Sequence, residues 1–438
     1  MNIAFVGCGF VFDIYMRTIR AHPELKICGV YDIQSERSAK VGAYYGFHVY
    51  KSYNELLSDD AVDIVVNLTN IGSHFEVSKR ALDAGKNVYS EKPLAKSVDE
   101  CRQLFDLARS KGLLFYGAPC NVYSDAVRTM FKAVEDGAIG KPLLVYAELD
   151  DNPIHLMEFE KVKSLTGAPW PLKEEIHEGC TYEHVGYHLV WICALLGPAV
   201  SVTAFSSELI ENKMAGLLAK VGTPDYSVAC LGFANGAAAR ITCSVVAPRD
   251  HRMRIIGDAG EVSADSYRHY QSPVSLERFS KGSLNARKFH TLRAHPMLGH
   301  LFGIGGRKLK PVRNWKSTAV ESDQQMRTSL KQRLVEWLRR REVYSQDKVI
   351  GIAEMAHALK QRNKPFLSPD FLMHINELTL LIQNAGSQGI AVQPSTSFEP
   401  LGPILGNLDA DQNYRTTYRR ALLEGLFDRL IRICFLNH

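Results

Sequence analysis

The chain begins with Met1-Asn2-Ile3-Ala4-Phe5-Val6-Gly7-Cys8-Gly9-Phe10-Val11-Phe12, and this stretch is the first indication of its fold. The apolar run from Ile3 to Val6 is typical of a buried parallel strand. Gly7 and Gly9 then form a tight turn, and residues 13–21 are expected to continue as a helix. Gly7 permits the sharp turn, while Gly9 lets the backbone approach a pyrophosphate at the helix N-terminus. The stretch therefore predicts the start of a dinucleotide-binding unit, although Phe12 stands where a third glycine is usual.

A second apolar strand, expected over residues 26–31, ends directly before Asp32. An acidic residue about 20 positions after the glycine turn can bind a ribose hydroxyl, which strengthens the nucleotide-binding interpretation. No arginine follows Asp32 directly, and a carboxylate repels a 2′-phosphate, so the expected cofactor is NAD. Arg37 lies near enough in the sequence to keep NADP open. The simpler alternative is a short buried strand with a glycine turn and no ligand.

Length and composition narrow the class of protein. With 438 residues, 46% of them hydrophobic and 23% charged, the chain is long enough for two domains of a soluble globular protein. No uninterrupted apolar run is long enough to span a bilayer, and no basic leader precedes the glycine turn. The nine cysteines lack a Cys-x-x-Cys pair, which favours reduced thiols in a cytoplasmic protein. The net charge of +5 is too small to indicate nucleic-acid binding, though it suits an anionic substrate.

The order of strands and helices predicts two domains and a tail. Strands and helices alternate over residues 1–121, which predicts an NAD(P)-binding Rossmann domain on a parallel sheet. Strands then follow one another over 122–400, which indicates an α+β substrate and oligomerisation domain with a mostly antiparallel open sheet. Its expected elements are helices over 125–136, 184–196, 350–361 and 369–384, and strands over 142–150, 200–207, 225–233, 237–246 and 252–264. Residues 401–438 are expected to form a C-terminal helical extension, with a helix over 414–435.

The segment 281–345 is rich in lysine, arginine and histidine and shows no regular period. Arg339, Arg340 and Arg341 carry this basic character into an expected helix over 328–342. One interpretation is a solvated basic loop and helix face. The other is a surface that approaches phosphate groups or a membrane.

The most specific motif lies in residues 84–95, which read Ala-Gly-Lys-Asn-Val-Tyr-Ser-Glu-Lys-Pro-Leu-Ala. Its Lys92 follows a strand of the expected parallel sheet, at the crevice where a nicotinamide would lie. A lysine there can hold the oxygen of a reacting hydroxyl or ketone, and it can pass a proton if its pKa is lowered. Together with the glycine turn, this motif resembles that of the glucose–fructose oxidoreductase / inositol dehydrogenase / MocA (Gfo/Idh/MocA) family. The resemblance extends over residues 1–385 and includes the turn Gly257-Asp258-Ala259-Gly260.

The resemblance implies site residues. Members of the family carry Asp-x-Gly-x-His where this chain reads His184-Val185-Gly186-Tyr187-His188. This implies that His188 is a general acid/base, with His184 in the place of the usual aspartate. The residues implied to bind the cofactor are Gly7, Gly9, Phe10, Val11, Asp32, Arg37, Thr69, Asn70, His74, Glu91, Lys92 and Asn121.

The chain also departs from the family pattern. Asn70 replaces a common proline, and Asn121 ends a stretch where many relatives have an arginine. From the residues alone, His184 and His188 share one helix face and could be structural histidines or a metal pair. No third ligand stands at a telling spacing, so no metal is expected.

These features predict an NAD(P)-dependent dehydrogenase or reductase that acts on a CH–OH group. A hydride would move between the nicotinamide and a ring carbon of a sugar, nucleotide sugar or cyclitol, with Lys92 and His188 as the reacting pair. The resemblance also implies a homodimer or homotetramer. Two alternatives stay open: an NAD-dependent glycosidase that oxidises its substrate transiently, and a sensor or scaffold that binds the dinucleotide without chemistry.

Overall fold

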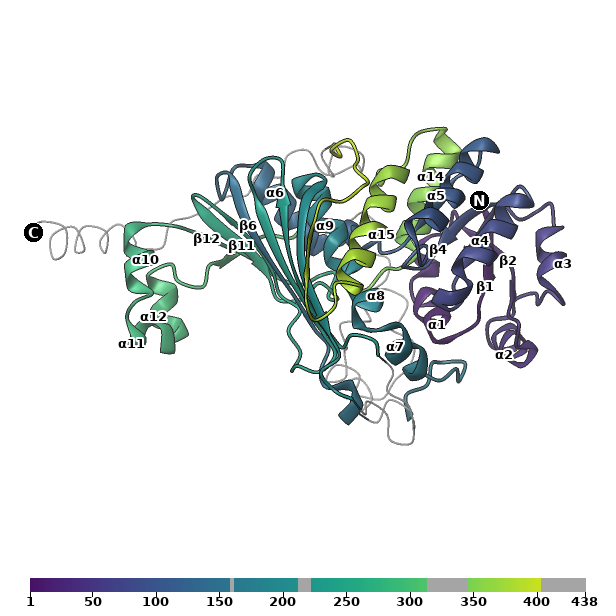
Figure 1. The fold of residues 1–438 in the computed structure, drawn as a ribbon, viewed down its shortest axis with the longest axis horizontal. Helices are drawn as coiled ribbons and strands as arrows, with labels where there is room; N and C mark the ends of the chain where they lie inside the picture. Colours follow the sequence, from purple (N-terminus) through teal and green to yellow (C-terminus); the bar gives the residue numbers. More distant parts are fainter. Residues whose placement is uncertain (158–160, 212–221, 313–344, 403–438) are drawn as a thin grey trace, which may run out of the picture.

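The computed structural model describes residues 1–157, 161–211, 222–312 and 345–402 of the chain. A parallel sheet near the N-terminus is followed by a larger, mostly antiparallel sheet, and the two lie side by side along the long axis of the molecule (Figure 1). This confirms the predicted fold class, a Rossmann domain followed by an α+β domain. The helices expected over 328–342 and 414–435 lie outside the described residues.

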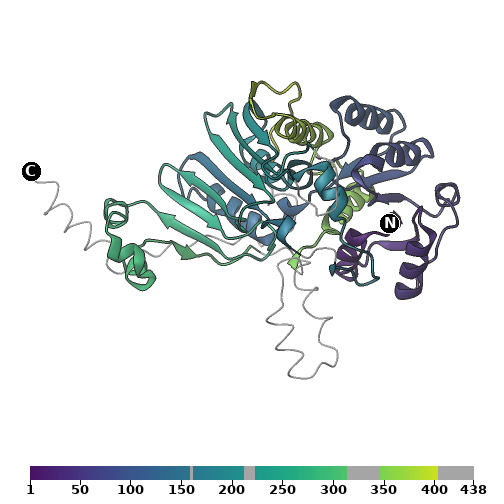
Figure 2. The ribbon, with the colours of Figure 1, turned by 60° about the horizontal axis from the view of Figure 1, so that its bottom comes forward.

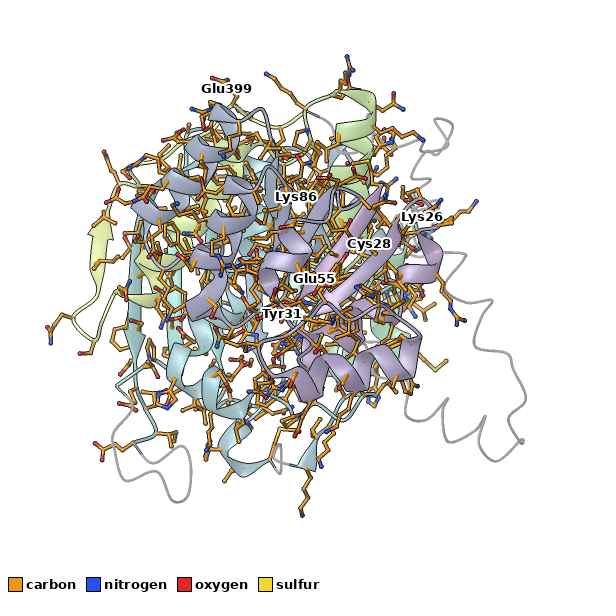
Figure 3. The ribbon with its side chains drawn as sticks, turned by 90° about the vertical axis from the view of Figure 1, so that its right-hand side faces the viewer. Lys26, Cys28, Tyr31, Glu55, Lys86 and Glu399 are labelled. Carbon is orange, nitrogen blue, oxygen red and sulfur yellow. The ribbon has the colours of Figure 1, made fainter. Side chains whose placement is uncertain are left out.

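The first domain has the sheet order β2-β1-β3-β4-β5, and all its neighbouring strands are parallel. The order reverses between β1 and β3, so a ligand crevice is expected beyond the carboxyl ends of these two strands. Strand β2 forms one edge of the sheet, and Figure 3 shows Lys26, Cys28 and Tyr31 along it. The elements are β1 (Asn2–Val6), α1 (Phe10–Met16), β2 (Lys26–Tyr31), α2 (Ser35–Tyr45), α3 (Tyr53–Leu57), β3 (Ile64–Asn67), α4 (His74–Asp83), β4 (Asn87–Ser90), α5 (Val98–Ser110) and β5 (Phe115–Gly117).

Helix α1 differs from the expected helix over 13–21. It begins at Phe10, directly after the glycine turn, and ends at Met16, and a short 3-10 turn, η1, follows over Ile19–Ala21. Phe12, at the position of the usual third glycine, is fully buried and packs edge-on against Phe5 with ring centroids 5.3 Å apart. Phe12 therefore fills the space between α1 and the sheet and leaves the glycine turn intact.

The second domain is built on a sheet with nine strands among the described residues, in the order β13-β12-β11-β10-β6-β9-β8-β7-β14. All neighbouring pairs are antiparallel except β6 and β9, which are parallel. Burial alternates along the strands, for example in β8, so one face packs against helices and the other is more open. The strands are β6 (Pro142–Asp150), β7 (Ala199–Ser207), β8 (Tyr226–Phe233), β9 (Ala238–Ser244), β10 (Met253–Gly257), β11 (Gly260–Ala264), β12 (Val274–Arg278), β13 (Arg307–Lys308) and β14 (Ile390–Val392).

Two expected elements of this domain are divided in the structure. The strand expected over 252–264 is the hairpin of β10 and β11, two antiparallel strands joined by the turn from Gly257 to Gly260. The helix expected over 184–196 is α8 (Cys180–His184) followed by α9 (Gly186–Leu196). The sequence reasoning did not predict α7 (Leu172–Glu178), α10 (Lys281–Ala286), α11 (His290–Ala294) or α12 (Pro296–Leu301).

Helices α6 (Asp125–Glu135), α14 (Ile350–Gln361) and α15 (Pro369–Gln383) begin and end within about one residue of the expected bounds. Helix α15 connects the two domains through hydrogen bonds. The side-chain oxygen of Asn376 accepts hydrogen bonds from the backbone N–H groups of Leu94 and Ala95, at 3.0 and 3.3 Å. These two residues directly follow Lys92 and Pro93, so the second domain anchors the segment that carries the lysine.

Candidate active site

The glycine turn has the geometry that a dinucleotide needs. Gly7 has φ +99°, and a Cβ on it would lie 2.6 Å from the carbonyl oxygen of Leu68, so a side chain cannot be accommodated there. A Cβ on Gly9 would meet nothing within 4 Å, so the backbone is open to a ligand. Phe10 and Val11 form the first turn of α1, whose first N–H groups have no partner within the helix. This is a suitable place for a pyrophosphate.

Asp32 lies at the end of β2, beside the same turn. Its two carboxylate oxygens accept hydrogen bonds from the backbone N–H groups of Cys8 and Gln34, both at 2.7 Å. Each oxygen of an ionised carboxylate keeps a further lone pair, so Asp32 is held in place and can still accept a bond from a ribose hydroxyl.

A cavity of about 460 Å³ opens next to Asp32. From the first domain it is lined by Cys8 and by residues 33–37 and Lys40, which include Arg37. Residues 166–169 of the second domain form its other wall. The cavity is therefore at the end of the crevice where the adenosine part of a dinucleotide is expected, and Lys92 does not line it.

The wall from the second domain is tied to helix α1. The backbone N–H and the hydroxyl of Thr166 both donate to one oxygen of Asp13, at 2.9 and 2.8 Å, and the hydroxyl of Tyr45 donates to the other at 2.8 Å. Asp13 is fully buried. The sequence reasoning missed this contact, because 153 residues separate the two partners.

Lys92 lies just after β4, as expected, and its ammonium is held by the second domain. Its Nζ donates to the backbone oxygen and to the side chain of Glu183, at 2.5 and 2.6 Å. Burial on its own would lower the pKa of Lys92, but the carboxylate of Glu183, together with Tyr187 and Glu91, outweighs burial and raises it. The lowered pKa that proton transfer by this lysine would require is therefore not present, and Lys92 is a charged hydrogen-bond donor.

His74 positions the turn that carries Lys92. Its ring nitrogens lie 2.7 Å from the carbonyl oxygen of Pro93 and 3.0 Å from that of Thr69. Burial lowers the pKa of His74. Asn70 accepts a hydrogen bond from Ser73 N–H at 3.1 Å and so caps η2 (Ile71–Ser73). Thr69, Asn70 and His74 thus shape the loop after β3, next to the glycine turn.

A second buried lysine, Lys348, stands beside the motif and was not predicted. Its Nζ donates to Glu91 at 3.1 Å and to the hydroxyl of Tyr187 at 3.2 Å, and Tyr15 donates to the same oxygen of Glu91 at 2.8 Å. Burial would raise the pKa of Glu91, but Lys348 and then Lys92 outweigh it and lower the pKa to about 2. Both lysines also face the ring of Tyr187, with Nζ 5.7 and 5.6 Å from its centroid. The site therefore holds two cations and two carboxylates around one tyrosine.

His184 belongs to a buried polar cluster of the second domain. Its Nε2 is hydrogen-bonded to Glu175, and its Nδ1 lies 3.2 Å from a guanidinium nitrogen of Arg268. Because arginine only donates, Nδ1 accepts, and the proton of the neutral ring is assigned to Nε2. Arg268 also donates to Asp151 at 2.5 Å. Burial alone would raise the pKa of Asp151, but Arg268 and the neighbouring histidines lower it.

His188 points into the interior of the second domain. It is fully buried, its Nε2 lies 2.8 Å from the backbone oxygen of Glu148, and its Nδ1 accepts from the indole N–H of Trp191 at 3.0 Å. Burial lowers the pKa of His188 to about 3. A neutral ring with both nitrogens engaged does not suit the acid–base role expected for His188.

Asn121 faces the second domain as well, since its amide donates to the backbone oxygen of Tyr187 at 2.8 Å. It fixes the start of α9 against the first domain. Among the described residues, no group of three or more histidine, cysteine, aspartate or glutamate side chains is placed to hold a metal ion. In the same part of the chain, no helix has both the length and the apolar character needed to cross a membrane.

Comparison with known proteins identifies the family. Residues 1–118 match a family model described as an oxidoreductase family with an NAD-binding Rossmann fold, and residues 127–263 match the GFO/IDH/MocA C-terminal domain. The chain belongs to the Gfo/Idh/MocA oxidoreductase family. This family assignment agrees with the geometry of the glycine turn and Asp32, and the first domain is an NAD-binding Rossmann domain.

Individual relatives in this family are distant in sequence. A myo-inositol 2-dehydrogenase of Thermotoga maritima is 24% identical over 65% of this chain and 80% of its own length. An uncharacterized oxidoreductase of Escherichia coli, YhhX, is 31% identical over a region that covers 34% of this chain and 44% of that protein.

Solved structures of other oxidoreductases share the fold. An oxidoreductase from Agrobacterium radiobacter, in complex with NAD⁺, L-tartaric acid and magnesium, superposes with a TM-score of 0.64 at 14% identity, over 90% of this chain and 98% of the other. The UDP-N-acetylglucosamine 3-dehydrogenase GnnA from Acidithiobacillus ferrooxidans superposes with a TM-score of 0.59 at 16% identity, over 89% of this chain and 98% of the other. At these identities the likeness concerns the fold alone.

Proposed function

We propose that this protein is an NAD(P)-dependent dehydrogenase or reductase that acts on a ring hydroxyl of a sugar, nucleotide sugar or cyclitol. One observation carries the proposal: Lys92, the lysine of the Glu-Lys-Pro motif, is kept charged at the junction of the two domains by Glu183. The substrates named for relatives, inositols and a UDP-sugar, support the substrate class.

The residues present fit a dinucleotide. Gly7, Gly9 and the start of α1 would hold the pyrophosphate, Asp32 the ribose, and the cavity lined by Arg37 the adenosine. NAD is the preferred cofactor, because the Asp32 carboxylate repels a 2′-phosphate. The bound nicotinamide supplies or accepts the hydride.

Lys92 and Glu183 are the proposed reacting pair. Lys92 donates a hydrogen bond to the substrate oxygen and stabilises the negative charge that develops on it when its proton leaves. Glu183 accepts that proton during oxidation of the alcohol, and returns it during reduction. Its side chain is 18% exposed and lies 2.6 Å from Nζ of Lys92, so a hydroxyl that reaches the lysine also reaches this carboxylate. This assignment replaces the expected role of His188.

Lys348 and Tyr187 are positioning residues in this proposal. Lys348 neutralises Glu91, which adjoins Lys92 in the chain, and it also binds the hydroxyl of Tyr187. The ring of Tyr187 lies under both ammonium groups and so keeps Lys92 directed towards the second domain. His184 is bound to Glu175 and Arg268, and we assign it to the framework that holds α8, which carries Glu183.

The test compares Lys92→Met with the unchanged protein. NAD binding is measured by titration calorimetry, and turnover is followed at the NADH absorbance with sugars, nucleotide sugars and cyclitols. We expect binding within about twofold of the unchanged protein and no measurable turnover in the variant. Normal turnover in Lys92→Met refutes the proposal. Cleavage of a glycoside without net NADH would identify the glycosidase alternative, and NAD binding without turnover of any substrate class would favour the sensor.

A further inference from the structure

The three short helices α10, α11 and α12 form a protrusion at one end of the molecule. They follow β12, and both views show them beyond the end of the large sheet, on the side away from the Rossmann domain (Figures 1 and 2). We refer to residues 280–310 as the protrusion. Neither the cavity beside Asp32 nor the Lys92 site includes any of its residues.

The protrusion exposes large apolar side chains to solvent. Helices α11 and α12 pack closely through Gly299, where a Cβ would lie 2.9 Å from the Leu292 carbonyl oxygen. The side chain of Met297 is nevertheless 86% exposed. Four further apolar residues are exposed by 41–47%: Leu284, Phe289, Leu298 and Leu301. All five exposed apolar side chains lie within residues 284–301, and exposed apolar side chains that gather in one part of a surface are typical of an interaction site.

The protrusion is also strongly basic. Between residues 279 and 312 the chain carries seven lysines and arginines and no aspartate or glutamate. These seven charges exceed the net charge of +5 of the whole chain, so the remainder is slightly acidic. Arg287 is paired with Glu277 at 2.5 Å. Among these basic residues, Lys281, Lys288, Arg293 and Lys308 are exposed.

We propose that the protrusion docks this protein onto an anionic lipid surface. Short helices that combine exposed leucine, methionine and phenylalanine with lysine and arginine lie in the plane of a membrane interface. Their apolar side chains enter the boundary between headgroups and acyl chains, while the cations approach the lipid phosphates. A nucleic acid would satisfy the cations but would leave Met297 and Leu298 in water. The protrusion lies far from the Rossmann domain, so docking through it leaves the crevice accessible.

The test is co-sedimentation of the full-length protein with vesicles. Vesicles of phosphatidylcholine alone are compared with vesicles containing phosphatidylglycerol, and we expect binding only to the second kind. Binding should fall in 1 M salt, because the screening length shrinks to about 3 Å. The charge variant Lys281→Gln/Lys288→Gln/Arg293→Gln should bind about a hundredfold more weakly, at about fivefold for each cation removed.

A second variant tests the apolar contribution, and a third is the matched control. Met297→Gln/Leu298→Gln should weaken binding while leaving thermal unfolding and dehydrogenase turnover unchanged, since both side chains are exposed. Lys26→Gln/Lys51→Gln/Lys364→Gln removes three exposed lysines elsewhere and should bind as the unchanged protein does.

Four outcomes overturn the proposal. The first is the absence of binding to anionic vesicles. The second is equal binding by the charge variant and by the matched control. The third is a smaller oligomer of Met297→Gln/Leu298→Gln in light scattering, together with vesicle binding equal to that of the unchanged protein. This result would assign the exposed apolar side chains of the protrusion to a contact with a second copy of the chain. Tight binding to duplex DNA without binding to vesicles would assign the protrusion to nucleic acid and also overturn the proposal.

Discussion

Replacing Lys348 by methionine should destabilise the protein strongly, because it leaves a buried carboxylate without its main partner. Glu91 is 6% exposed, and Lys348 is the strongest of the groups that lower its pKa. A pKa that falls from 4.5 to about 2 corresponds to about 3 kcal/mol of stabilisation of the ionised form in the folded state. Breaking a buried pair by removing one partner typically costs about 3–5 kcal/mol. We therefore expect Lys348→Met to lose about 3 kcal/mol of unfolding free energy at pH 7.

The pH dependence gives this prediction a sign that a general packing defect would lack. The folded-state pKa of Glu91 lies below its ordinary value, so its contribution to stability is present above pH 4.5 and is lost as the pH falls towards 2. In Lys348→Met the carboxyl lacks its main cationic partner, so it takes up a proton at a higher pH than in the unchanged protein and then carries no buried charge. The difference between the variant and the unchanged protein should therefore shrink as the pH falls from 4.5 towards 2, where the unchanged protein loses the stabilisation of its ionised carboxyl.

Urea unfolding followed by circular dichroism at pH 7 and pH 3 measures both effects. The double variant Glu91→Gln/Lys348→Met removes the two charges together and should recover a large part of the loss at pH 7. Lys364→Met, at an exposed lysine, is the matched control and should change stability by less than about 0.5 kcal/mol. A loss below about 1 kcal/mol in Lys348→Met, or a double variant no more stable than the single one, would refute the reasoning.

Three further predictions concern the site. Glu183→Gln should lower kcat by a factor of about 10²–10⁴ with NAD affinity unchanged. His188→Asn should instead lower the unfolding free energy by about 1–3 kcal/mol and leave the kcat of the folded protein within about twofold. The reverse pattern in steady-state kinetics would restore His188 as the acid–base group. Asp32→Asn should weaken NAD binding about tenfold and weaken NADP binding less, because the repulsion of a 2′-phosphate is removed. Titration calorimetry with both cofactors measures this, and an unchanged ratio of the NAD and NADP affinities would contradict it. Thr166→Val removes one of the two hydrogen bonds from Thr166 to Asp13, and stopped-flow release of NADH should become about fivefold faster than in the control Thr203→Val. Equal release rates would show that the contact does not retain the cofactor.

The parts of the site that the sequence predicted are those that local patterns specify. Gly7, Gly9 and Asp32 stand at fixed distances along one strand–turn–helix–strand unit, so their spacing alone predicts that the glycine turn and the carboxylate lie side by side at the ends of β1 and β2. Lys92 follows a strand in the same way. The helix over 350–361 was predicted with its observed bounds, because its apolar pattern is long and uninterrupted.

The parts that were missed depend on contacts between distant segments. Lys348 lies 257 residues after Glu91, and no local pattern distinguishes it from a surface lysine. His188 matches the family motif in sequence, yet its environment is set by Glu148 and Trp191, which engage both nitrogens of its ring. A motif shows which residue occupies a position, whereas the tertiary neighbours determine the protonation state of that residue.

The pairing of charges in the site bears on the kind of group that can bind there. Lys92 is matched by Glu183, Lys348 by Glu91, and Arg268 by Asp151, so each of these three cations already has a carboxylate partner. A phosphate brought to Lys92 would meet the Glu183 carboxylate at close range, and like charges at such a distance repel. A neutral hydroxyl can accept from Lys92 and donate to Glu183 at once, and so enters the pair without leaving a buried charge unpartnered. The Lys92 site is therefore suited to the polyol part of a substrate, and any phosphate that the substrate carries should lie outside this pair.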